Sequence, residues 1–153
     1  INSHPLTHIC NLTYDQEDQI THRNLGGYGN NNFLQSTTYD YNPQGWMKSM
    51  TANLFQMSLN YDVANPTLGV PIQKNGNISF IEWQTLGQEK RTYGFKYDYL
   101  DRLTHSYYGD YANGGLQKTD AFNTTYTYDA VGNLDVLTRM EHIGMEQIGC
   151  QTR

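Results

Sequence analysis

The sequence is poor in charge and in apolar residues, and each shortage excludes a class of protein. Charged residues make up 16% of the chain and the formal net charge is −5, so no basic surface for nucleic acid is expected. No apolar run approaches the roughly 20 residues that a membrane-spanning helix needs. Hydrophobic residues make up 37% of the 153 residues, enough for one domain with a modest core.

Cysteine is nearly absent, and the patterns that hold metals or perform catalysis are missing. Cys10 and Cys150 make no disulfide framework, and the sequence leaves open whether they pair. His4 and His8 would bind a metal only on a helix, which Pro5 disfavours. Neither a nucleophile motif such as G-x-S-x-G nor a G-x-G-x-x-G phosphate loop occurs. We therefore predict no catalytic residue, metal or cofactor, and a protein that is not an enzyme.

Tyrosine is abundant, with 13 residues, and it accompanies many glycines and asparagines. Tyrosine favours strands, whereas glycine and asparagine favour turns. This mixture predicts an all-β fold of short strands. The segment "VLTRMEHIGMEQIG" has weak helical spacing that Gly144 interrupts, which leaves a short terminal helix as the minor alternative.

One short motif recurs along the chain. It consists of an aromatic residue, Asp or Asn, two variable residues, a turn residue, a polar or large residue and an apolar residue. The first two positions are Tyr14-Asp15, Tyr41-Asn42, Tyr97-Asp98 and Tyr128-Asp129. The fifth is Asp18, Gly45, Asp101 and Gly132, and the seventh is Ile20, Met47, Leu103 and Leu134. "IQKNGNIS" fits the second half of the motif, with Gly76 and Ile78 in register and Ile72 in the tyrosine place.

The period of this motif predicts a single repeat array without an internal domain boundary. The expected units run roughly over residues 14–40, 41–71, 72–96, 97–127 and 128–153. Each unit is expected to be an antiparallel β-hairpin, because Tyr126 and Tyr128 alternate with threonines before the turn. Asp129 can accept backbone N–H bonds in the turn, and Gly132 can adopt positive φ.

The segments "YDYLDRLTHSYYG" and "YDAVGNLDVLT" resemble the tyrosine-aspartate (YD) repeats of Rhs-type proteins. "YNPQGWMKSM" and "NGNISFIEWQ" are similar to versions in secreted proteins of the Bacteroidetes group, and the likeness extends from about Cys10 to Arg139. The resemblance implies a coiled β-sheet ribbon, which in longer relatives closes into a shell around a toxic C-terminal domain. A closed shell needs many more repeats than five, and the Asp-Pro motif of the self-cleaving segment of Rhs effectors is missing. The resemblance therefore extends neither to closure nor to self-cleavage.

The expected function is structural: a wall segment of a secreted or cell-surface Rhs-like protein that encloses a cargo. Its partners would be the remainder of a longer chain, since the sequence begins with Ile1, or other copies of itself. One alternative is a surface-binding module for a glycan or a partner cell, with Trp46 and Trp83 as stacking platforms. Another is an array that assembles edge to edge. "NLGGYGNNNF" and "YDVANPTLGVP" are expected to be surface loops, the second a candidate binding loop.

The residues expected to form the structural motif come from all five units. They are Tyr14, Asp15, Tyr41, Gly45, Gly76, Tyr97, Asp98, Leu103, Tyr128, Asp129, Gly132 and Leu134.

Overall fold

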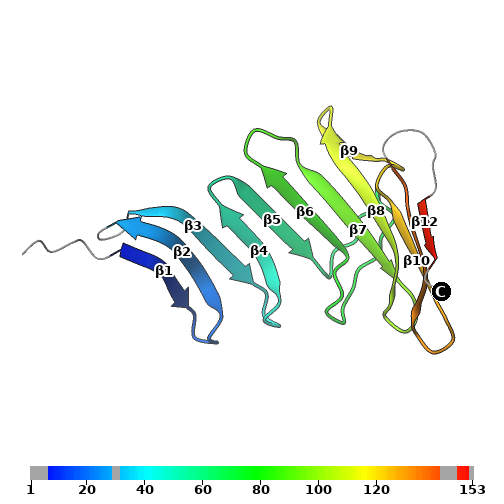
Figure 1. Ribbon diagram of the computed structural model, residues 1–153, viewed down its shortest axis with the longest axis horizontal. Helices are drawn as coiled ribbons and strands as arrows, with labels where there is room; N and C mark the ends of the chain where they lie inside the picture. The colour runs from blue at the N-terminus through cyan, green and yellow to red at the C-terminus, as the bar shows by residue number, and fades with distance from the viewer. Residues whose placement is uncertain (1–6, 29–31, 142–147, 152–153) are drawn as a thin grey trace, which may run out of the picture. The chain divides into compact units, whose positions relative to one another are not determined.

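A computed structural model describes residues 7–28, 32–141 and 148–151, and this part of the chain contains strands and turns but no helix (Figure 1). The prediction of an all-β array of antiparallel hairpins is confirmed. His4, Pro5 and Gly144 lie outside the described residues. The strands are β1 (Thr7–Tyr14), β2 (Ile20–Tyr28), β3 (Phe33–Tyr41), β4 (Met47–Ala52), β5 (Phe55–Asn60), β6 (Phe80–Thr85), β7 (Arg91–Tyr97), β8 (Leu103–Ala112), β9 (Gly115–Lys118), β10 (Thr124–Tyr128), β11 (Leu134–Arg139) and β12 (Ile148–Gln151).

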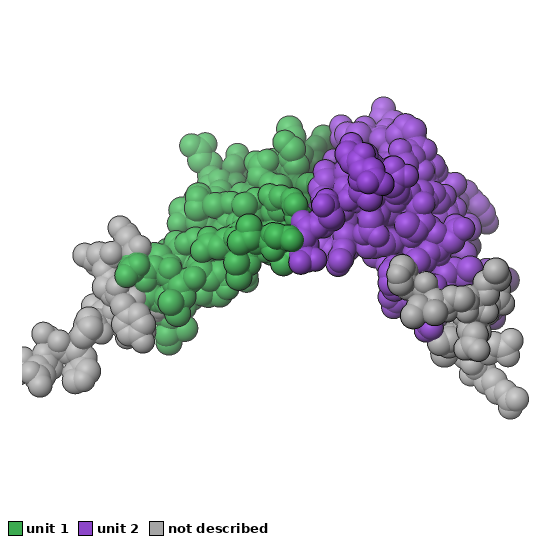
Figure 2. Space-filling view, turned by 90° about the horizontal axis from the view of Figure 1, so that it is seen from above, with its two compact units in different colours: residues 1–58, 84–87 green, residues 59–83, 88–153 purple. Residues whose placement is uncertain are grey.

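The chain divides into two compact units (Figure 2). Unit 1 comprises residues 1–58 and 84–87, and its strands β1 to β5 pair with one another in chain order. Unit 2 comprises residues 59–83 and 88–153. Its strands pair in the order β6-β7-β8-β10-β11-β12, and β9 pairs with the far end of β8. All of these pairings are antiparallel.

One face of unit 1 contains an apolar row and is called the apolar face, although Arg23 and Thr37 also lie on it. The opposite face is mostly polar apart from Ile9 and Leu34. Residues that pair across strands share a face, so the register defines the composition of each face. One face carries the row Tyr39, Met50 and Met57. The other face carries rows of small polar side chains: Asn11, Asn24 and Ser36; Thr38, Thr51 and Gln56; Asp40, Ser49 and Ser58.

The hydrophobic core of the described residues lies in unit 2. Leu68, Val70 and Phe80 form a buried cluster, against which Tyr107 and Leu116 pack. Leu68 and Val70 come from the segment between β5 and β6, which is folded over one face of the sheet. The segment "YDVANPTLGVP" therefore contributes core side chains and is not simply a surface loop.

Residues 62–72, which we call the excursion, begin and end at the same place in the fold. The backbone N–H of Gln73 donates to the carbonyl of Tyr61 at 2.6 Å, which closes the base of the excursion. Within it, Asn65 and Val70 exchange two backbone hydrogen bonds, at 3.0 and 3.1 Å. The Asn65 side chain also accepts from the Leu68 N–H at 3.1 Å, so its buried backbone groups find partners.

The other predicted loop, "NLGGYGNNNF", is also different in the structure. β2 continues through Tyr28 and β3 begins at Phe33, so most of this segment is paired strand. Gly26 has φ of +60°, and Leu34 Cδ1 lies 3.0 Å from where a Cβ at this glycine would stand. Glycines here thus serve an irregular strand rather than an open loop.

Candidate functional surface

The four tyrosine-bearing hairpins share one turn, in which five residues connect the two strands. The residue after the tyrosine accepts two backbone N–H bonds at Oδ1. At Asp129 these come from Val131 and Asn133, at 3.0 and 2.8 Å. Asp15, Asn42 and Asp98 accept the equivalent pair at 2.8 to 3.1 Å. The recurring Asp or Asn therefore organises the turn by filling the donors that the bend leaves unpaired.

The fifth position of the motif, which is the fourth residue of each turn, has a left-handed backbone conformation. Its φ is +60° at Asp18, +80° at Gly45, +62° at Asp101 and +94° at Gly132. Asp tolerates the conformations near +60°, whereas the larger angles are those of glycine. The remaining predicted glycine, Gly76, has φ of +95° in the turn before β6.

The return strand of each hairpin carries one extra residue just after the turn, which sequence reasoning missed. Tyr128 pairs with Leu134 and Thr127 with Val136, so Asp135 is a β-bulge. The same shift occurs in the other three hairpins, at Thr21, Lys48 and Thr104. The bulge position is occupied by threonine, lysine or aspartate, so no single residue type marks it in the sequence.

Three of the four motif tyrosines donate a hydrogen bond to the neighbouring hairpin. Tyr41 Oη donates to the carbonyl of Ile20 at 3.0 Å, Tyr97 Oη to Ile78 at 2.9 Å, and Tyr128 Oη to Leu103 at 2.7 Å. Each acceptor is the seventh residue of the motif in the adjacent hairpin. We call this contact the tyrosine latch. It explains why tyrosine rather than phenylalanine occupies the first position, because the ring packs while the hydroxyl satisfies a carbonyl.

The third unit differs from the prediction. Ile72 does not end a strand; it lies in the excursion with an exposed side chain. Tyr61 directly follows β5, is buried, and precedes Asp62. The Tyr-Asp pair of this unit was therefore present in the sequence, but the excursion of residues 62–72 separates it from the turn at Gly76.

Hydrogen bonds lower the pKa of two of the turn aspartates, Asp98 and Asp129. Partial desolvation would raise the pKa of Asp98, but bonds from the Arg102 side chain and from two backbone N–H groups lower it below the usual range. The Arg102 guanidinium also lies 2.7 Å from Asp98 Oδ2. Bonds from Asn133, through its side chain and its backbone, lower the pKa of Asp129.

We expect the stability from these turns to be lost in acid. A carboxyl with a lowered folded pKa stabilises the fold above the ordinary aspartate pKa of about 3.9, and this contribution disappears as the pH falls through the lowered value. Asp129→Asn keeps an acceptor in the turn, as Asn42 does naturally, but does not titrate. Urea midpoints at pH 6 and pH 2.5 should therefore differ less for Asp129→Asn than for the native chain. Equal differences would contradict this assignment.

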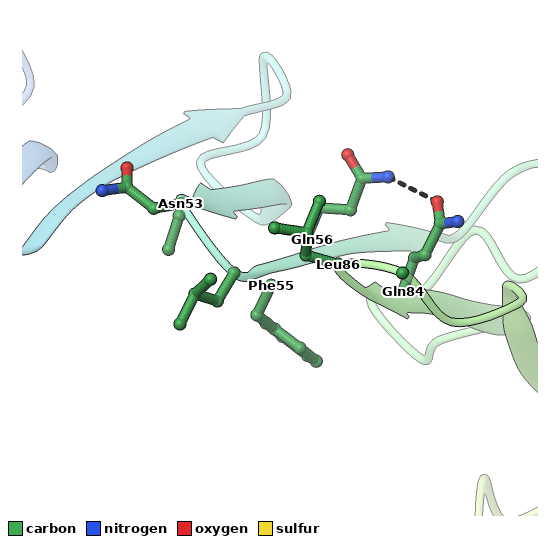
Figure 3. Close-up of a pocket in the computed structure, with 8 residues that line it drawn as sticks. Asn53, Phe55, Gln56, Gln84 and Leu86 are labelled. Carbon is green, nitrogen blue, oxygen red and sulfur yellow. Dashed lines mark hydrogen bonds between the residues drawn. The ribbon is translucent and has the colours of Figure 1, made fainter.

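Apolar and amide side chains together line shallow pockets of unit 1, one of which is drawn in Figure 3. One pocket of about 200 Å³ lies where Gln56 Nε2 donates to Gln84 Oε1 at 2.8 Å, and Phe55 points away from this amide pair. A second pocket, of about 360 Å³, shares Leu54 and Phe55 with the first. Leu54 and Leu86 are 65% and 71% exposed. These two pockets can accept small apolar groups, but neither is lined by a charged residue that would orient them.

The aromatic side chains of unit 2 pack on one another. Trp83 stacks on Tyr93 with ring centroids 5.7 Å apart, and Tyr108 contacts both rings. Phe122 adds an edge-on contact to Tyr108 at 5.2 Å. The stacking occupies one face of the indole, which weakens the case for Trp83 as a sugar platform. Trp46 is half-buried at the end of the second turn.

Glu82, Lys90 and Tyr111 form a polar cluster in which the pKa of the tyrosine is raised. Tyr111 Oη donates to Glu82, and Lys90 Nζ lies 3.2 Å from the same oxygen. Burial, followed by the Glu82 bond and charge, raises the pKa of Tyr111. Lys90 also lies over the Tyr111 ring, 4.1 Å from its centroid. The cluster connects the middle of β6 with the end of β8 and is explained as a structural ion pair.

No protein-family model matches the chain, and no curated protein matches it significantly. Within the described ranges, no group of three or more His, Cys, Asp or Glu side chains is arranged to hold a metal ion. No helix long and apolar enough to cross a membrane occurs there either. Cys10 is free and exposed, and the side chain of Cys150 lies outside the description.

Proposed function

We propose that the chain is a wall segment of a secreted or surface Rhs-like protein, and that its apolar face encloses a polypeptide cargo such as a C-terminal toxin domain. The proposal rests above all on the apolar face of unit 1. The five buried apolar side chains of the described residues all belong to unit 2: Tyr61, Leu68, Val70, Phe80 and Tyr108. The apolar face of unit 1 therefore has methionines and aromatic residues but no buried hydrophobic cluster.

The chemistry of this face suits an adaptable contact with polypeptide. Met50 and Met57 are flexible and polarizable, so they can pack against many shapes. Beside them, Arg23 pairs with Thr37 across β2 and β3. Arg23 Nε and Thr37 Oγ1 are buried and have no hydrogen-bond partner among the described residues. Both atoms are shielded from solvent, so the adaptable contact with an enclosed chain rests on the methionines.

The repeated frame suits a wall. Tyrosine latches tie consecutive hairpins through the backbone, and Asx turns close each hairpin at the same length. Such a frame can be extended by adding hairpins without a new core for each, because every unit packs on its neighbour.

The test is binding of a permanently unfolded polypeptide, for which a reduced and carboxymethylated protein with a fluorescent label serves as the probe. We expect Met50→Glu to weaken binding at least tenfold in fluorescence anisotropy, because it places a charge in the apolar row. Thr51→Glu is the matched control, since Thr51 lies next in β4 on the polar face. Far-UV circular dichroism establishes that both variants fold.

Equal losses in the two variants would show that charge, not the apolar face, controls binding, and the proposal would fail. The intact mass of the protein in its native source is a second test. A mass well above 17.6 kDa supports a wall segment, whereas a mass near 17.6 kDa contradicts enclosure by a longer wall.

A further inference from the structure

The three tyrosine latches obey one register rule. In each, the residue four before the tyrosine pairs with the residue three after the carbonyl acceptor. The pairs are Thr37 with Arg23, Tyr93 with Ile81, and Thr124 with Ser106. The latch therefore specifies how the first strand of one hairpin aligns with the return strand of its neighbour, in addition to holding them together.

Tyr14 has the latch position but no latch. It ends β1, the outermost strand of unit 1, and is followed by the Asx turn at Asp15. Its side chain is 52% exposed, whereas the latched tyrosines are half-buried. Among the described residues, none accepts a hydrogen bond from its hydroxyl.

Within the described ranges, β1 pairs with β2 alone, so its other edge is unpaired there. Ile9 is 84% and Leu12 39% exposed, and Cys10 is exposed between them. An unpaired strand edge of this kind presents N–H and C=O groups that bind another strand.

We infer that the β1 edge binds the return strand of a further Tyr-Asx hairpin that is not one of those described here, with Tyr14 as its latch. The occupant follows from continuity with the interface already repeated three times in the chain. Its seventh-position carbonyl accepts from Tyr14 Oη, and the third residue after that carbonyl lies opposite Cys10. This inference deepens the proposed function, because a wall requires a defined joint at this edge.

The register makes Cys10 a built-in reporter. As the probe we choose a cyclic peptide of residues 124–139, whose ends pair as Thr124 with Arg139 and can be joined by a D-Pro-Gly turn. Its seventh-position residue is Leu134, so residue 137 should lie opposite Cys10. Peptides with Leu137→Cys or Val136→Cys are incubated with the full chain carrying Cys150→Ser, under oxidised glutathione. Mixed disulfide is then quantified by intact mass.

We expect at least tenfold more mixed disulfide with the Leu137→Cys peptide than with the Val136→Cys peptide, whose thiol faces the opposite side of the sheet. Tyr14→Phe, which removes only the hydroxyl, should lower the yield with the first peptide at least threefold. Tyr99→Phe is the control, because it also removes one tyrosine hydroxyl, from a residue that is 89% exposed. It should leave the yield unchanged.

Equal yields with the two peptides, or no effect of Tyr14→Phe, would overturn the inference. A Cys10-linked dimer of the chain that excludes the peptide would also overturn it, because the occupant would then be a second copy. These outcomes concern the edge of the sheet, whereas the Met50→Glu experiment concerns its face, so the two proposals fail separately.

Discussion

Replacing Leu68 with alanine is expected to lower the free energy of unfolding by about 3 kcal/mol, measured by urea denaturation. Leu68 is fully buried, and truncation of such a leucine costs both its transfer free energy and the cavity left behind. Leu54→Ala is the matched control, because Leu54 is 65% exposed in a turn, and it should change stability by less than about 0.5 kcal/mol. Equal effects of the two changes would show that the excursion does not form a core.

A double-mutant cycle with Gly94 locates the partner of Leu68. A Cβ at Gly94 would lie 2.9 Å from both Leu68 Cδ1 and Val70 Cγ1, so Gly94→Ala alone should destabilise by overpacking. Once Leu68→Ala has removed one of these contacts, the same change should cost less. Additive effects would contradict direct packing of the excursion on β7.

Replacing Gly132 with valine is expected to destabilise the protein by about 2 kcal/mol. Gly132 has φ of +94°, and a β-branched residue at positive φ is strained whatever space surrounds it. Space is not the limit here, because the nearest atom to an added Cβ, Arg102 Nη1, is 3.9 Å away. We therefore expect backbone strain to be the main cause of the loss.

Thermal denaturation followed by circular dichroism provides the measurement. Val131→Ala, at the adjacent and 84% exposed residue, is the control and should have almost no effect. An unchanged melting temperature for Gly132→Val would contradict the assigned conformation of the turn.

The all-β fold could be predicted because its signals are local. A tyrosine, an aspartate and a residue that accepts positive φ lie within five positions of one another, and their chemistry acts within the same turn. The alternation of Tyr126 and Tyr128 with threonines likewise reports a single strand. Such signals need no knowledge of the neighbouring hairpin.

The latches and the excursion could not be predicted because they depend on register between hairpins. Nothing near Tyr128 in the sequence indicates that its hydroxyl meets the carbonyl of Leu103, 25 residues earlier. The excursion hid the third Tyr-Asp pair, since Tyr61 and Gly76 are far outside the usual spacing. Backbone bonds from Gln73 to Tyr61 and from Ser79 to Asn60 bring the two parts of this unit together.

The bond from Gln73 to Tyr61 has an evolutionary consequence. Because the chain returns to the hairpin where it left, insertions and deletions between Tyr61 and Gln73 can accumulate without shifting the alignment of any flanking strand. Only length changes that leave Leu68 and Val70 on the sheet would be tolerated, because these two side chains form the buried core. The excursion can therefore vary in length at its exposed positions, while its two core side chains stay in place.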